Sequence, residues 1–223
     1  MPRMLKLYSP LLMVLVLAPP AWAEGNVKAE SVPAPTASEV PKALLDVLEA
    51  QGARVAGDQG TICEIWLRKG MTIGQAAGGL GDIMYAQLGT GNLVGVLHFP
   101  SQGADFRGNP VKAGYYALRY ALIPQDGAHM GVYSTRDALA MTPVAADTQI
   151  EQTLSFEDVV KLSKQASGTP HPAFQVMSAV AEGASFPSIG KDDLGHSNLQ
   201  LKVQGKNGDL AIGITVVGKW AGE

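Results

Sequence analysis

The sequence predicts a mainly β protein, a single antiparallel β-sandwich with one or two short accessory helices. This prediction rests on runs of alternating apolar and polar residues, on turn-forming residues between most of those runs, and on one clear hairpin. In the hairpin, residues 198–204 alternate, Gly205-Lys206-Asn207-Gly208 forms a turn, and residues 210–217 return. Because neighbouring side chains of a strand point to opposite faces, the alternation indicates one buried face and one wetter face.

The runs typical of strands are mostly bounded by glycine, proline or asparagine. They are residues 61–68, 92–99, 115–123, 138–144, 173–180, 198–204 and 210–217. In the first run, Cys63 falls among the apolar side chains and Glu64 falls on the wetter face. No convincing linker or repeat divides the chain, so we expect one β-sandwich domain over residues 39–223, with a split near residue 150 as the alternative.

Accessory helices are predicted at two places along the chain. Over residues 39–51, leucines recur on one face, and Gly52 is suited to end the helix in a left-handed conformation. Later, Ser155 and Asp158 form a cap of the capping-box type ahead of an apolar stripe that ends at Gly168.

Residues 1–23 have the pattern of a secretory signal peptide. Basic residues precede a short apolar run, and Ala21-Trp22-Ala23 supplies a small-residue cleavage site. The apolar run is too short to favour the alternative, an uncleaved membrane anchor. Residues 24–38 are rich in proline and polar residues and are expected to form a flexible leader. The sequence therefore predicts a periplasmic or secreted protein.

Composition and charge exclude several classes of function. The 17 basic and 20 acidic residues give a net charge of −3, which argues against nucleic acid as a partner. A single cysteine rules out an internal disulfide. No second apolar run approaches membrane-spanning length, so we expect no transmembrane anchor once the signal peptide is removed.

The most unusual stretch places polar residues in the connections around the predicted strand 115–123. If the ends of adjacent hairpins meet, then Arg107, His129, Arg136 and Asp137 form a polar site for a small anionic or polyhydroxylated ligand. Arginine supplies forked donors for such a ligand, and histidine supplies one tunable contact. The competing interpretation is structural: Arg136 and Asp137 pair with their neighbours, and Arg107 only solvates a loop.

The second candidate function is a metal-dependent hydrolase or metal-binding protein centred on His129. The sequence offers little for it, because its 4 histidines lack the spacing of metal ligands and no nucleophile motif is present. We therefore predict no catalytic residue, no metal ligand and no cofactor, and we consider an enzyme the less favoured reading.

Several motifs resemble an uncharacterised family of exported bacterial proteins. They are Glu64-Ile65-Trp66-Leu67-Arg68-Lys69, the run from Lys112 to Tyr120, the loop Asp126-Gly127-Ala128-His129-Met130-Gly131, and Arg136-Asp137. The resemblance begins near residue 40 and implies export, but it brings no reaction with it. The tyrosine-bearing strand within the run from Lys112 to Tyr120 is also similar to strands of other β-sandwich modules. That similarity is too general to imply an activity.

These observations together predict an exported cell-envelope protein that acts as a non-catalytic module for a small ligand or a protein partner. A protein partner could also bind by adding a strand to a sheet edge.

Overall fold

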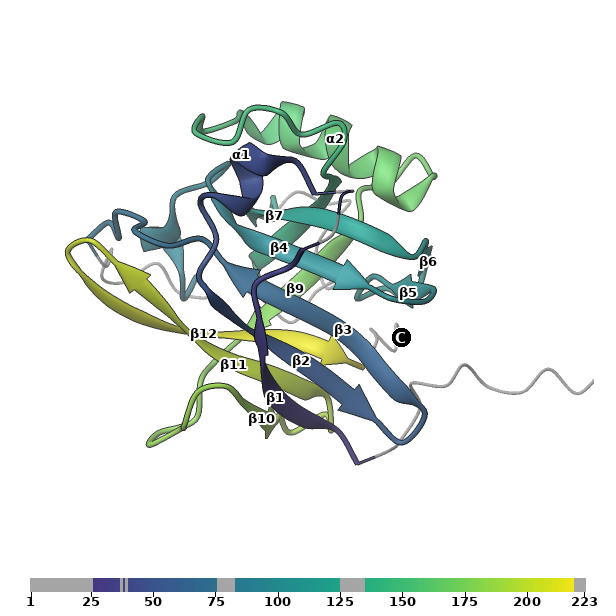
Figure 1. Ribbon diagram of the computed structural model, residues 1–223, viewed down its shortest axis with the longest axis vertical. Helices are drawn as coiled ribbons and strands as arrows, with labels where there is room; N and C mark the ends of the chain where they lie inside the picture. Colours follow the sequence, from purple (N-terminus) through teal and green to yellow (C-terminus); the bar gives the residue numbers. More distant parts are fainter. Residues whose placement is uncertain (1–25, 37, 39, 76–82, 125–134, 219–223) are drawn as a thin grey trace, which may run out of the picture.

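The computed structural model describes residues 26–36, 38, 40–75, 83–124 and 135–218. Within them the chain forms one large antiparallel sheet in the order β1-β2-β3-β4-β7-β8-β9-β12-β11-β10 (Figure 1). The strands of this sheet are β1 (Lys28–Pro33), β2 (Gln51–Gly57), β3 (Gly60–Leu67), β4 (Leu93–Phe99), β7 (Gly114–Leu122), β8 (Asp137–Pro143), β9 (Phe174–Ser178), β10 (Ser188–Lys191), β11 (Ser197–Gly205) and β12 (Gly208–Val217). The predicted mainly β class, antiparallel pairing and short helices are confirmed.

The two layers expected of a sandwich are the two halves of this single sheet, which curls until it is nearly closed. Its edge strands β1 and β10 come side by side in Figure 1, and no pairing between them is found in the described part of the chain. A short pair, β5 (Gly103–Ala104) and β6 (Pro110–Val111), lies in the connection between β4 and β7.

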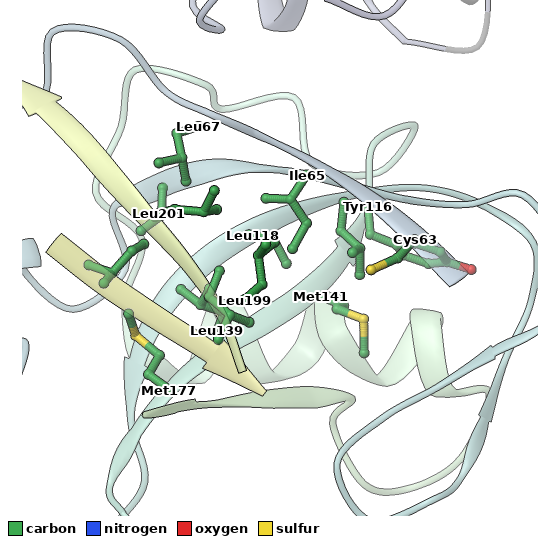
Figure 2. Close-up of a cluster of buried hydrophobic side chains, with 14 of the residues drawn as sticks. Cys63, Ile65, Leu67, Tyr116, Leu118, Leu139, Met141, Met177, Leu199 and Leu201 are labelled. Carbon is green, nitrogen blue, oxygen red and sulfur yellow. The ribbon is translucent and has the colours of Figure 1, made fainter. Parts of the chain in front are cut away.

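The main core fills the space inside the curled sheet. Figure 2 shows Ile65, Leu118 and Leu139 from one half meeting Leu199 and Leu201 from the other. All of these side chains are buried. Because each strand alternates, the residues between them face outward, where α1 (Lys42–Leu45), α2 (Phe156–Ser167) and the segment before α2 cover part of the sheet.

The helix predicted near residue 155 forms as expected. The Ser155 side chain accepts a hydrogen bond from the Asp158 backbone N–H, and Gly168 ends α2 in a left-handed conformation with φ of 63°. Val159 is fully buried against the outer face, in a cluster that includes Ala138 and Ala140 of β8.

The helix predicted over residues 39–51 is wrong beyond its first turn. Only α1 is helical, because the backbone beyond it pairs with the end of β3: Glu49 N–H donates to Leu67 O, and Lys69 N–H donates to Val47 O. Gly52 lies within β2 and does not end a helix. Its missing side chain lets the Trp66 ring cross β2, where Nε1 donates to Pro33 O at 2.9 Å.

The flexible leader predicted over residues 24–38 is wrong for Lys28–Pro33, which form the edge strand β1. Backbone pairing with β2 does not require an apolar sequence. Val32 is nevertheless buried, in the same hydrophobic cluster as Trp66. The predicted signal peptide, residues 1–23, lies outside the described residues.

A buried ion pair holds the segment before α2 against the outer face of the sheet. The Arg119 side chain of β7 and the Asp147 side chain are both fully buried, with Nε–Oδ2 and Nη2–Oδ1 distances of 2.6 Å. Thr142 Oγ1 also donates to Asp147 at 2.7 Å. The other Arg119 donors reach backbone carbonyls of neighbouring loops, those of Gly91, Gln149 and Gln152. The guanidinium therefore has an acceptor for every N–H.

Replacing Arg119 with lysine should lower the free energy of unfolding by about 3 kcal/mol, because an ammonium cannot reach the Asp147 carboxylate and all three backbone carbonyls at once. Lys42→Gln is the matched control, since the Lys42–Asp46 pair is exposed and should contribute less than about 1 kcal/mol. Urea unfolding in low and high salt checks both variants. Equal, salt-sensitive losses in the two variants would contradict this account of Arg119.

Gly52→Ala should cost about 2 kcal/mol, because the added methyl group would overlap the Trp66 ring and the backbone of Ile65. Gly57→Ala in the same strand is the control: its methyl group would meet only the flexible end of Ile62, at 3.2 Å. Thermal unfolding of both variants measures the difference. A loss at position 57 as large as that at position 52 would refute the close-packing explanation.

Candidate binding site

Asp137, one of the residues predicted to bind ligand, is a buried structural acceptor at the start of β8. Its carboxylate accepts hydrogen bonds from Tyr120 Oη at 2.6 Å, from Met84 N at 2.7 Å and from Tyr85 N at 2.9 Å. Thr135 Oγ1 also donates to it. Burial, and then the Asp137 carboxylate, raise the pKa of Tyr120 above its usual value. These contacts favour the structural interpretation of Asp137.

Arg136 and Arg107 occupy different places in the fold. Arg136 is half-buried, and its Nε donates to Ile123 O at 3.0 Å. Arg107 is exposed in the β5–β6 connection, next to Phe106, whose N–H donates to Phe174 O.

The expected meeting of Arg107 with Asp137 does not occur. Phe174 pairs with Ala140, which lies three residues along β8 from Asp137. At about 3.3 Å per residue, the Arg107 loop is displaced from Asp137 by about 10 Å along the strand. The connections that carry these residues leave β7 from opposite ends, since Gly114 pairs with Phe99 and Leu122 pairs with Asp137. His129, the fourth predicted site residue, lies outside the described residues.

A cavity of about 220 Å³ opens at the end of the curled sheet where β2 turns into β3. We call it the mouth cavity. Its walls come from the β2–β3 turn, the segment after β4, strand β9 and the end of β12. Its apolar side chains are Ile62, Phe99, Val216 and Val217, and its polar side chains are Gln59, Thr61, Ser101, Gln102, Asp105 and Gln175.

Gln175 is the most buried amide of the mouth cavity. Its Nε2 donates to Ala104 O at 2.7 Å, which fixes the orientation of the side chain. The remaining amide oxygen, Oε1, has no hydrogen-bond donor among the described residues, and Gln175 also lines the narrow space beneath the cavity. The amide oxygen is therefore available to accept a hydrogen bond from a ligand.

Asp105 lines the mouth cavity and is buried. Burial raises the pKa of its carboxyl group, although hydrogen bonds from Asn109 and from the Arg107 backbone act in the opposite direction. Asn109 N donates to Asp105 Oδ1 at 2.8 Å, and Asn109 Nδ2 lies 3.0 Å from Oδ2. This carboxyl group mainly closes the turn that forms the cavity wall.

Beneath the mouth cavity, a gap of about 10 Å³ leads toward the core and is lined by Cys63, Leu118 and Ile214 among others. Cys63 lies inside the curled sheet in Figure 2, as the alternation of the sequence predicted. Burial, and then the neighbouring Glu64 carboxylate, raise the pKa of the thiol from 9.0 to about 12. The thiol therefore stays protonated at neutral pH and is a poor nucleophile.

Elsewhere in the described chain, His98 and His196 each lie 3.0 Å from a carboxylate, those of Glu64 and Asp192. Glu64 also accepts from Arg54 Nε at 2.8 Å. Burial raises the pKa of Glu64, but the hydrogen bonds from His98 and Arg54 outweigh it and leave the pKa below its usual value. Among the residues that the structure describes, no three His, Cys, Asp or Glu side chains come together as a metal site would require.

Comparison with protein-family models, with curated proteins and with solved structures finds no match to this chain. In the described segments, no helix is both long enough and apolar enough to cross a membrane.

The sequence did not identify Gln175 or Arg119 as important residues. For Arg119 a signal was present, since an arginine alternates with apolar residues in a buried strand and must find acceptors there. For Gln175 no local pattern exists, because the mouth cavity is assembled from segments more than 100 residues apart.

Asp137→Ala should lower the free energy of unfolding by about 3 kcal/mol, because several buried donors lose their acceptor at once. Arg136→Ala should cost about 1 kcal/mol, the value of one half-buried hydrogen bond. Urea unfolding of the two variants measures the contrast. A stable Asp137→Ala protein that unfolds like the wild type would show that the carboxylate is not structural.

The buried thiol should make stability fall at high pH. Its folded pKa is raised, so Cys63 contributes stability that is fully present below about pH 9 and is lost as pH rises toward about 12. Relative to Cys63→Ala, the wild type should lose up to about 1.4 kcal/mol for each pH unit in that window. The tyrosines are present in both proteins, so the difference isolates the thiol. A difference that stays constant with pH would disprove the raised pKa.

Proposed function

We propose that this protein is an exported, non-catalytic binding module of the cell envelope, and that it binds a small polyhydroxylated molecule in the mouth cavity. The observation that carries the proposal is a cavity with apolar side chains on one part of its wall and amide and hydroxyl groups on the rest. Such a combination suits a ligand that has both apolar faces and hydroxyl groups.

The lining favours hydroxyl groups over anions. Among the described residues that line it there is no lysine or arginine, and the one charged residue, Asp105, is acidic. Gln175 Oε1 and the Thr61 hydroxyl are placed to exchange hydrogen bonds with an uncharged ligand. The volume of about 220 Å³ lies below the roughly 300–1,000 Å³ of drug-sized sites, which suits a molecule as small as a monosaccharide.

Separate observations support export and a non-catalytic binding role. The first 23 residues have the pattern of a secretory signal peptide, which supports a periplasmic or secreted location. The Cys63 thiol beneath the mouth cavity has a pKa of about 12 and stays protonated. The Asp105 carboxyl group is occupied by Asn109.

Thermal unfolding against a panel of monosaccharides, sugar alcohols and small carboxylic acids tests the proposal. A ligand present at 100 times its Kd should add about 2.7 kcal/mol of stability. We expect the shift with a hydroxylated compound and expect Gln175→Met, which keeps the side-chain length, to reduce it. Arg136→Ala is the matched control and should leave the shift unchanged.

A shift only with carboxylic acids that is lost in Arg136→Ala would contradict the proposal and favour the anion site expected from the sequence. No shift with any compound of the panel would also contradict it.

A further inference from the structure

A second hollow lies at the opposite end of the curled sheet, between β11 and the pair β1–β2. We call it the seam groove, and its volume is about 570 Å³. Its floor is apolar and is formed by Ile65, Leu67 and Leu201, whose side chains also belong to the core. Figure 2 shows Leu67 and Leu201 at the same end of that core. The groove therefore reaches the interior through the gap that the unclosed sheet leaves.

Opposite charges line this groove without an ion-pair partner. Neither Glu49 nor Lys202 forms a salt bridge with any other described residue. The Lys202 ammonium lies 5.4 Å from the centre of the Phe186 ring, which also lines the groove. A ligand that carries one positive and one negative group would satisfy both side chains.

The backbone of β11 adds a feature typical of peptide sites. Gln204 O accepts from Gly70 N, so Gln204 turns its backbone groups away from β12. Backbone groups alternate along a strand, and Lys202 therefore presents its N–H and C=O on the same side. On the side of β11 that faces away from β12, pairing with β10 stops at Ser188↔Gln200. No described strand pairs with Lys202 on that side. This exposed edge can receive the backbone of one extended residue.

We propose that the seam groove binds short peptides with apolar side chains and free termini. The apolar side chains would enter the floor formed by Ile65, Leu67 and Leu201, and the peptide backbone would pair with Lys202. The peptide carboxylate would lie at the Lys202 ammonium, and the peptide ammonium at Glu49. This site is distinct from the mouth cavity, and its ligand belongs to a different chemical class.

Calorimetric titration with trileucine tests this proposal, with dileucine and tetraleucine to measure the span between the charges. Blocking the N-terminus with acetyl, or the C-terminus as the amide, should each weaken binding about fivefold. Lys202→Gln should abolish the preference for the free carboxylate, and Glu49→Gln should abolish the preference for the free amine. Lys206→Gln and Glu182→Gln, exposed residues outside the groove, are the matched controls and should bind like the wild type.

Absence of binding at millimolar trileucine would overturn the proposal. Equal affinity for free and blocked peptides would overturn it as well, because the charges would then play no part. Binding that is lost in Gln175→Met but kept in Lys202→Gln would assign the peptide to the mouth cavity and refute the seam groove. Circular dichroism of each variant confirms that the fold is retained.

Discussion

The buried pairing of Arg119 with Asp147 is the interaction on which the arrangement of this sheet depends. Strands β7 and β8 lie in the middle of the sheet and carry small residues, Ala117, Ala121, Ala138 and Ala140, on their outer face. That face is dry only if the segment before α2 stays folded over it. Arg119 holds this segment through the Asp147 carboxylate and through the backbone carbonyl groups of Gln149 and Gln152. Removing either charge would leave the other buried without a partner, which is far more costly than losing a surface pair.

A single sheet that curls almost to closure also determines where binding can occur. Its interior is filled by side chains from both halves, so open space remains at the ends and along the gap between β1 and β10. The mouth cavity has a wall of amides and hydroxyls above a protonated thiol. The seam groove combines an apolar floor with an open strand edge and with the charges of Glu49 and Lys202, which have no ion-pair partner among the described residues. The linings of the two cavities therefore differ in chemistry.

Local sequence patterns predicted most strands of the sheet and the capped helix. Period-two alternation identified β3, β4, β7, β8, β9, β11 and β12, and the Ser155 cap identified α2. Features without a local pattern were missed. β1 is held by backbone pairing with β2, and Gly52 is needed only because Trp66, from another strand, crosses it. The predicted site joined residues that precede β7 with residues that follow it, and the connections before and after a strand leave it at opposite ends.

In the proposed complex, a small hydroxylated ligand lies at the mouth of the curled sheet, above Cys63. Methyl NMR of the protein during titration with the compound that raises its melting temperature tests this most directly. The methyl resonances of Ile62 and Val216 should shift first and saturate with the ligand, while those of Leu44 and Ile150, on the outer face, should stay in place. Shifts confined to the outer face, or to Leu67 and Leu201 in the seam groove, would contradict it.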